Sequence, residues 1–286
     1  MPHPFRALSM RLLLALTRGT RLKGRLRLAM ALNRFVMPPG GFVRSRMRSG
    51  LVMELDLTDS LQQWFHYLGE YETPESALIL SMLPPDGVFV DVGANVGWHT
   101  LQAAAHLQGR GWVYAFEPLA MNAERLVRNL ELNGLSNVTV EVLGLTDRAE
   151  TVDLATEFLR SGNASMARRG AVMRGHYDVR CLPFDEYVSR QGLDRIDFIK
   201  IDVEGAELRT LKGMTRVLTR PNAPPVLCEL NPVLLSLMGS SAREVESYFE
   251  SHGYEARPPR GRQGTPRLDH GEAVEGHTNV LFVHRG

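Results

Sequence analysis

The stretch FVDVGANVGWHT, Phe89 to Thr100, runs from an apolar strand through a glycine turn into a helix. Such units hold nucleotide-like cofactors, because glycine lets the backbone turn tightly and approach a ligand, and the start of the helix presents N–H groups that lack helical partners. The stretch therefore predicts an α/β fold with a cofactor loop. The candidate loop residues are Asp91, Gly93, Ala94, Asn95 and Gly97.

Short apolar runs separated by helical segments continue this pattern along the chain. The expected strands are Val88 to Val92, Trp112 to Phe116, Val138 to Leu143, Ile196 to Ile201, Val226 to Leu230 and Asn279 to His284. Strands that alternate with helices predict a mostly parallel sheet covered by helices on both faces. Ligands bind such sheets beyond the carboxyl ends of the strands, so the loops after these strands form the candidate site.

The first part of the chain differs in composition. Residues 1–50 hold eleven Arg or Lys and no Asp or Glu, whereas residues 51–286 hold 22 basic and 32 acidic residues. The acid-free, leucine-spaced arm is typical of an amphipathic helix on anionic lipid, and equally of a solvated basic helix or a disordered arm. An organelle transit peptide ranks third. The longest early apolar run, Leu12 to Leu16, is too short to span a bilayer.

These changes in composition and pattern divide the sequence into three regions. Residues 1–50 are a basic arm that we expect to be helical, and residues 51–85 add the second strand of a hairpin and two helices, at 60–68 and 74–83. Residues 86–286 form the cofactor-binding domain. Cys181 and Cys228 suit core positions in a reducing compartment better than a disulfide, which predicts a cytoplasmic protein, peripheral at the membrane if the arm binds lipid.

The glycine loop does not fit the common phosphate-bearing cofactors. A dinucleotide fingerprint needs glycine at its first, third and sixth positions, which here are Gly93, Asn95 and Trp98, and no lysine follows the glycines as in a P-loop. Glu117, which with Pro118 closes the next strand, can accept hydrogen bonds from ribose hydroxyls. These features favour a ligand with a ribose and positive charge but no phosphate, such as S-adenosylmethionine.

Six ordered stretches carry a family resemblance. They are VFVDVGANVGWHTL, VYAFEPLAMNAERLVRNLELNG, LGLTDRAE, SGNASM, IDFIKIDVEGAELRTLKGM and PVLCELNP, within residues 60–255. The chain resembles an FkbM-type methyltransferase, a class I S-adenosylmethionine-dependent family. That resemblance implies a seven-stranded Rossmann-like sheet, preceded here by the hairpin and helices, with an antiparallel final hairpin.

The resemblance also implies roles for particular residues. Asp91, Gly93, Asn95 and Gly97 would line the methionine end of the cofactor, and Glu117 would bind its ribose. Asn122 would support the same pocket, and Asp147 would meet the adenine amino group. Taken singly, the glycines, the Glu117-Pro118 pair and Asp147 could serve only turns and helix starts. Their joint position after consecutive strands favours a cofactor site.

The stretch IDVEGAE lies where the methyl group should be delivered. Asp202, Glu204 and Glu207 could simply favour a helix start, but mutual repulsion opposes three acids in one cleft. We expect Asp202 to be the base or the orienter of an acceptor hydroxyl, with Glu204 as its rival. The predicted reaction is O-methylation of a small-molecule, sugar or lipid-like metabolite, an acceptor chemistry that the resemblance implies.

Other readings fare worse. The acidic body is a poor match for nucleic acid, and we expect no metal, because the cluster from His270 to His277 has no helical frame. A non-catalytic membrane-associated module with the same fold, and a nucleotide-sugar or NAD-type enzyme, stay as alternatives. The sequence leaves open the acceptor, which we expect to meet the 156–176 loop and the terminal extensions, the role of the 258–276 loop, and the oligomeric state.

Overall fold

The computed structural model describes residues 4–20, 22–153, 177–257 and 278–286. The chain forms two compact units that divide between Thr73 and Pro74. The expected boundaries at residues 50 and 85 fall inside the first and the second unit, respectively.

The first unit is a pair of helices followed by a hairpin and a third helix. Its elements are α1 (Pro4–Gly19), α2 (Arg25–Val36), β1 (Phe42–Arg46), β2 (Val52–Asp56) and α3 (Ser60–Leu68). β1 and β2 pair antiparallel, which confirms the predicted hairpin. A small core joins the three helices through Leu13, Leu26, Ala29, Val36, Tyr67 and Leu68. Within the described residues, no helix is long and apolar enough to cross a membrane.

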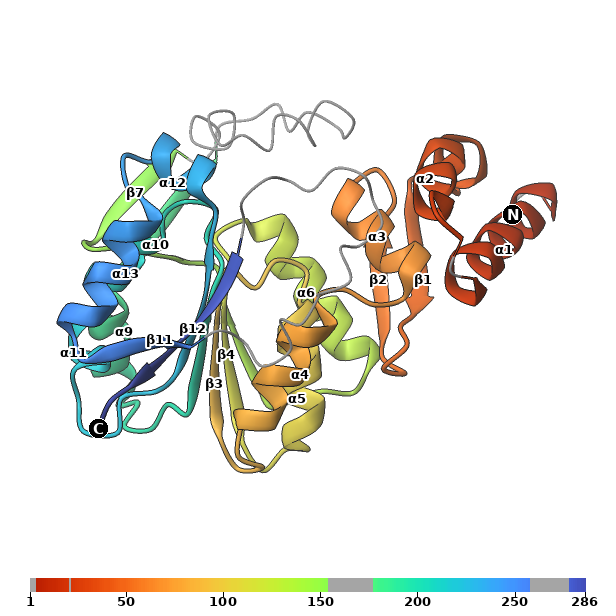
Figure 1. The fold of residues 1–286 in the computed structure, drawn as a ribbon. Helices are drawn as coiled ribbons and strands as arrows, with labels where there is room; N and C mark the ends of the chain where they lie inside the picture. The colour runs from red at the N-terminus through yellow and green to blue at the C-terminus, as the bar shows by residue number, and fades with distance from the viewer. Residues whose placement is uncertain (1–3, 21, 154–176, 258–277) are drawn as a thin grey trace. The chain divides into compact units, whose positions relative to one another are not determined.

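A seven-stranded sheet organises the second unit (Figure 1). The strands, in spatial order, are β11 (Tyr254–Arg257), β12 (Thr278–His284), β10 (Val226–Leu230), β9 (Phe198–Ile201), β3 (Val88–Val92), β4 (Trp112–Phe116) and β5 (Val138–Glu141). β12 runs antiparallel to both of its neighbours, and the pairs from β10 to β5 are parallel. The order reverses between β3 and β9, so a crevice for ligands is expected at their carboxyl ends.

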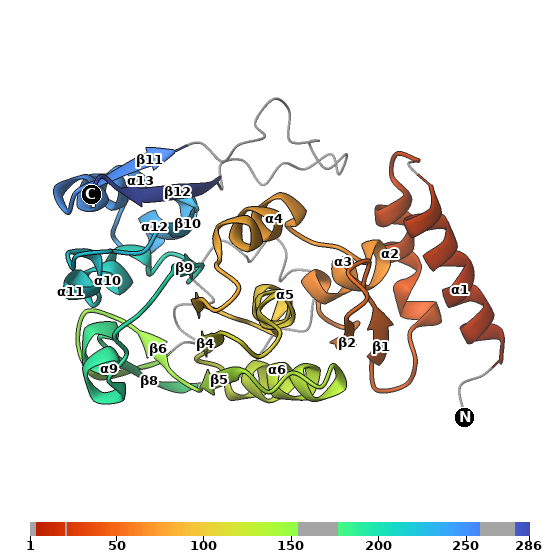
Figure 2. The same ribbon diagram turned by 90° about the horizontal axis from the view of Figure 1, so that it is seen from below.

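Helices cover both faces of this sheet, as predicted. They are α4 (Thr73–Met82), α5 (Trp98–Leu107), α6 (Ala120–Leu132), α9 (Phe184–Gln191), α10 (Glu207–Lys212), α11 (Thr215–Leu218), α12 (Pro232–Leu237) and α13 (Ala242–Ser251). Figures 1 and 2 show α4 and α5 on one side and α10, α11 and α13 on the other. Alternate residues of each strand point to opposite faces of the sheet and belong to two separate cores. Phe89 and Phe198 face α4 and α5, whereas Val90 and Ile199 face the helices on the other side.

A three-stranded sheet beside β5 was not predicted. It joins β6 (Gly144–Leu145), β8 (Asp178–Leu182) and β7 (Glu150–Asp153), with β8 in the middle. Two predicted strands are also shorter than expected: β5 ends at Glu141, and β9 begins at Phe198. Asp197 lies just before β9 and accepts a hydrogen bond from Val88 N through its side chain (2.7 Å), so it fastens the two strand starts together.

Candidate active site

The β3–α5 loop is built from backbone that only glycine adopts easily. Gly93 and Gly97 have φ values of 83° and 97°, and Asn95 between them has a φ of 51°. A Cβ atom at Gly93 would collide with the backbone oxygen of Asp202. The loop after β3 therefore packs directly on the end of β9, which brings the predicted cofactor loop and the predicted catalytic loop together.

Glu117 fixes the shape of this loop from the end of β4. Its carboxylate accepts hydrogen bonds from Asn95 N (2.8 Å), Leu119 N (3.0 Å) and Asn122 Nδ2 (3.2 Å). The side chain is 5% exposed, and burial raises the pKa of the carboxyl, although the donors from Leu119, Asn95 and Asn122 oppose that shift. Asn122 thus lies beside Glu117 and donates to its carboxylate.

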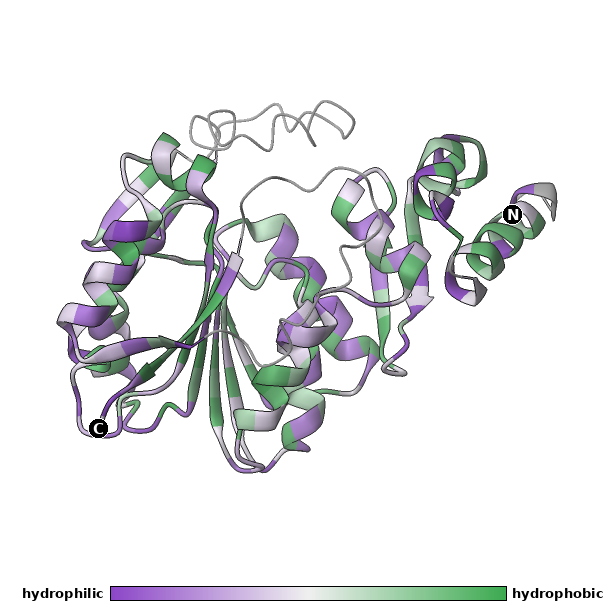
Figure 3. Ribbon diagram, viewed as in Figure 1, coloured by the Kyte–Doolittle hydropathy of each residue, from purple (hydrophilic) through white to green (hydrophobic). Residues whose placement is uncertain are grey.

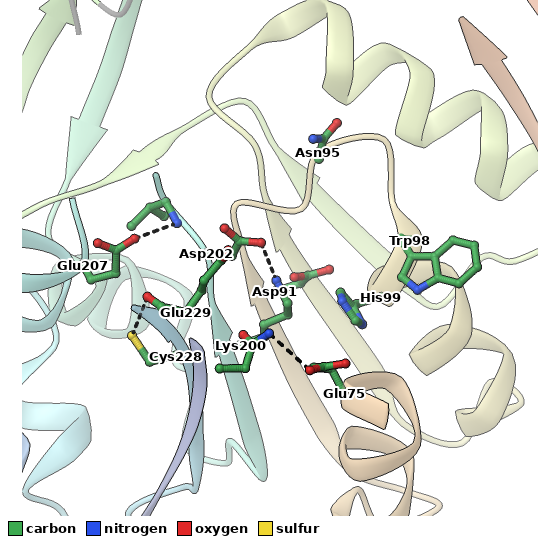
Figure 4. Close-up of polar contacts among 12 residues, drawn as sticks. Glu75, Asp91, Asn95, Trp98, His99, Lys200, Asp202, Glu207, Cys228 and Glu229 are labelled. Atoms are coloured by element: carbon green, nitrogen blue, oxygen red, sulfur yellow. Dashed lines mark hydrogen bonds and ion pairs between the residues drawn. The ribbon is translucent and has the colours of Figure 1, made fainter. Parts of the chain in front are cut away.

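A row of polar side chains crosses one face of the sheet at its carboxyl edge. Asp91 of β3 is the register partner of Lys200 of β9, and Asp202 follows Lys200 on the same side of the strand. Figure 4 shows these three residues gathered together, with Glu229 of β10 beside them. Beneath this row, the same face carries the apolar side chains that pack on α4 and α5.

Lys200 is the centre of this row, and sequence reasoning missed it. Its side chain is 3% exposed, and Nζ lies 2.9 Å from Asp202 Oδ2. A lysine inside the apolar run FIKI was the available signal, because a buried ammonium needs a partner. Burial would raise the pKa of Asp202, but Lys200, together with a hydrogen bond to Glu229 and the nearby His99, lowers it to about 2.

Asp91 lies next to this ion pair and keeps one oxygen available. Oδ2 accepts a hydrogen bond from Thr100 Oγ1 (2.6 Å), and the side chain is 1% exposed. Oδ1 is buried and has no hydrogen-bond partner among the described residues. A buried acceptor in this state is costly unless a ligand donates to it.

The three acids of IDVEGAE have different surroundings. Asp202 is 24% exposed, whereas Glu204 is exposed on a backbone with a φ of 54°. Glu207 is 2% exposed, and its Oε1 accepts hydrogen bonds from Gly205 N (3.0 Å) and Val203 N (3.4 Å). Burial raises the pKa of Glu207 to about 7. Glu207 therefore braces the loop that carries Asp202 and Glu204.

An apolar pocket opens beside the cofactor loop. Its wall includes Gly93, Phe116, Pro118, Leu143, Val203 and Met238. Arg209 also lines this pocket and holds Asp147 in an ion pair (2.8 Å), and it binds Glu150 as well. Asp147 itself does not line the pocket, so the structure brings it to this site through Arg209.

These features fit S-adenosylmethionine. The apolar pocket suits a flat adenine ring, the carboxylate of Glu117 can accept from ribose hydroxyls, and Asp91 Oδ1 can accept from an ammonium group. The cluster from His270 to His277, at which no metal is expected, and the loops at 156–176 and 258–276 lie outside the described residues. In the described part of the chain, no group of His, Cys, Asp and Glu could hold a metal ion.

The strand order, the antiparallel β12 and the glycine loop after β3 define a Rossmann-like class I methyltransferase fold. A family model described as Methyltransferase FkbM domain matches residues 91–256, which is more than half of the chain. The chain belongs to the FkbM methyltransferase family, and S-adenosylmethionine is the cofactor of this domain. The predicted family, fold and cofactor are confirmed.

Three known proteins are similar to parts of this chain. Methyltransferase sdnD of Sordaria araneosa is 30% identical over 164 residues, which cover 47% of this chain and 63% of sdnD. Hexuronic acid methyltransferase AglP of Haloferax volcanii is 30% identical over 145 residues, 51% of this chain and 57% of AglP. The 2-O-methyltransferase NoeI of Sinorhizobium fredii is 27% identical over 195 residues, 61% of this chain and 79% of NoeI. The chain spans less than two thirds of the first two.

Proposed function

We propose that this protein transfers the methyl group of S-adenosylmethionine to a hydroxyl of a small-molecule, sugar or lipid-like metabolite. The Lys200–Asp202 ion pair at the end of the central strand carries this proposal, because it keeps a carboxylate ionised beside the cofactor loop. The names of AglP and NoeI, a hexuronic acid methyltransferase and a 2-O-methyltransferase, support an oxygen acceptor.

In this proposal Asp202 orients the acceptor hydroxyl and receives its proton. S-adenosylmethionine supplies a methyl group activated by its sulfonium. Asp202 accepts a hydrogen bond from the hydroxyl, and the proton moves to the carboxylate as the new carbon–oxygen bond forms and the carbon–sulfur bond breaks. The lowered pKa keeps Asp202 ionised before the reaction, so the carboxylate can orient the hydroxyl and then accept its proton. Glu204, on the same loop, stays the rival for this role.

The cofactor would lie across the ends of β3 and β4. We propose that Asp91, Gly93, Ala94, Asn95 and Gly97 hold its methionine end and that Glu117 holds its ribose. Pro118 and the apolar pocket would hold the adenine, Asn122 would keep Glu117 in place, and Asp147 would reach the adenine amino group. Arg209 binds both Asp147 and Glu150, so Asp147 would contact the adenine while it stays paired with Arg209.

Product analysis tests the acceptor chemistry. Pure protein is incubated with methyl-labelled S-adenosylmethionine and pools of sugars, hydroxylated metabolites and lipids, and the labelled product is isolated. We expect a methyl ether, which keeps its label in mild alkali. A label released as methanol would show a carboxylate acceptor, and a methylamine would show a nitrogen acceptor. Either result would overturn the O-methylation of a hydroxyl while leaving the cofactor site intact.

The two alternative functions make different demands on the site. A non-catalytic module has no need of a buried lysine that keeps Asp202 ionised, because such a pair is costly to bury. An NAD-type enzyme needs bare backbone where Asn95 and Trp98 stand. The methyltransferase proposal accounts for both features.

A further inference from the structure

Exposed apolar side chains are concentrated in the first unit. Thirteen large hydrophobic residues are exposed in the described part of the chain, and more than half of them precede residue 43. Those seven are Leu8, Leu12, Leu22, Leu28, Leu32, Phe35 and Phe42. Single exposed leucines are normal on a protein surface, but a cluster of this density marks an interaction surface.

These side chains follow helical spacing. Leu28, Leu32 and Phe35 stand at i, i+4 and i+7 of α2, with exposed fractions of 50%, 37% and 58%. Leu8 and Leu12 stand at i and i+4 of α1, with exposed fractions of 58% and 63%. Each helix therefore presents an outward apolar stripe. We call these five residues the outer stripe.

A different stripe of each helix already fills the core of the unit. Leu13 of α1 packs with Leu26, Ala29 and Val36 of α2 on the first unit's core. Both helices are thus apolar on two faces, and Figure 3 shows the green of hydrophobic residues along both of them. The outer stripe lies on the face of each helix that does not pack on this core, so each helix has a second apolar face free for a partner.

The charges that α1 and α2 themselves place around the outer stripe are all positive. Arg6, Arg11, Lys23, Arg27 and Arg34 are exposed, and no acidic residue occurs before Glu54. The Arg34 guanidinium lies 4.6 Å from the ring centre of Phe35, so a positive charge lies directly beside an exposed aromatic ring on α2. Exposed leucines interleaved with cations match the interface of an anionic bilayer, where acyl chains lie beneath phosphate groups.

We propose that the α1–α2 face of the first unit docks on an anionic lipid surface. The outer stripe enters the boundary between headgroups and acyl chains, and the five cations lie at the level of the phosphates. Contact is peripheral and reversible, because neither helix can cross the bilayer. The inference is independent of the proposed methyl acceptor, since it rests only on residues of the first unit.

Vesicle sedimentation with the full chain tests the proposal. Vesicles of phosphatidylcholine with about a third phosphatidylglycerol are compared with phosphatidylcholine alone, at low and high salt. We expect binding to the anionic vesicles only, and weaker binding at high salt because surface charges are screened. Equal affinity for both vesicles, or no binding to either, would overturn the proposal.

Two pairs of matched variants locate the contact. Leu28→Gln with Leu32→Gln should weaken anionic vesicle binding at least tenfold, whereas Val127→Gln with Val233→Gln, at exposed positions of α6 and α12, should not. Arg27→Gln with Arg34→Gln should weaken it about fivefold per lost charge, and Lys212→Gln with Arg243→Gln should not. Unchanged S-adenosylhomocysteine affinity shows that the second unit is folded, and an unchanged helical circular dichroism signal shows that α1 and α2 are folded.

A second copy of the chain and an apolar protein are the rival occupants of this face. If gel filtration showed a dimer that Leu28→Gln with Leu32→Gln dissolved, and vesicle binding were absent, the face would be a protein interface and the lipid proposal would be wrong. Vesicle binding that survives both pairs of first-unit variants would place the lipid contact elsewhere and would also overturn it.

Discussion

Lys200 Nζ lies 2.9 Å from Asp202 Oδ2, and only 3% of the lysine side chain is exposed. Removing one partner of a buried pair leaves the other uncompensated, which commonly costs about 3–5 kcal/mol, and less where one partner is partly exposed, as Asp202 is. The pair thus ties the charge state of Asp202 to one residue in the middle of β9.

Asp202→Asn should slow methyl transfer about a hundredfold or more, because the amide keeps the shape of the carboxylate but cannot receive the proton. S-adenosylhomocysteine affinity should change only a few-fold, and Glu204→Gln should keep near-normal turnover. Steady-state kinetics with the identified acceptor checks both. If Glu204→Gln lost turnover and Asp202→Asn did not, the role would belong to Glu204, and two active variants would make this loop structural.

Lys200→Met should move the acid limb of the kcat/KM profile upward. In the native protein the pKa of Asp202 is lowered to about 2, so its ionised form is lost only as the pH falls toward that value. Without the ammonium, burial dominates and the pKa rises. Lys200→Arg keeps the charge and should leave the limb low. Identical pH profiles for the native protein and Lys200→Met would show that Lys200 does not set the charge of Asp202.

Glu207→Gln should flatten the pH dependence of stability. The folded pKa of Glu207, about 7, is higher than its unfolded value, so its contribution is fully present below about pH 4.5 and is lost as the pH rises through 7. The amide still accepts from Gly205 N. Thermal unfolding at pH 5 and pH 8 should show a smaller loss for the variant than for the native protein. An equal loss in both would mean that Glu207 titrates normally.

Gly93→Ala should be far more damaging than Gly109→Ala. Both glycines have positive φ values, 83° and 75°, so the backbone strain is similar, on the order of 1 kcal/mol. Only at Gly93 would the new Cβ collide with the Asp202 backbone, whereas nothing lies within 4 Å at Gly109. Calorimetric unfolding and S-adenosylhomocysteine binding compare the two, and equal effects would refute the close approach of the two loops.

The sequence predicted the parallel core of the sheet well. The bounds of β3, β4 and β10 agree with the predicted strands residue for residue, because strands buried on both faces are nearly continuous apolar segments with glycine, proline or polar residues at their ends. The three-stranded sheet escaped prediction because β6 has only two residues and pairs with β8, far along the chain. Local patterns do not encode such pairings.

The candidate site also contains residues that the sequence could predict and residues that it could not. Loop residues such as Gly93 and Glu117 could be selected because they follow predicted strands directly. The importance of Lys200 could not, since it depends on the β3–β9 register that places it beside Asp91. Whether Asp202 or Glu204 takes the proton also depends on side-chain exposure, which their spacing in IDVEGAE does not reveal.

Calorimetric titration with S-adenosylhomocysteine and with NAD tests the central claim most directly. We predict micromolar binding of S-adenosylhomocysteine, about −8 kcal/mol at 1 μM, and hardly any binding of NAD. Glu117→Ala should weaken the former by about 1.5–3 kcal/mol, the value of a hydrogen bond to a charged group, while Glu124→Ala, at an exposed position of α6, should not. Tight NAD binding, or full affinity in Glu117→Ala, would contradict the account.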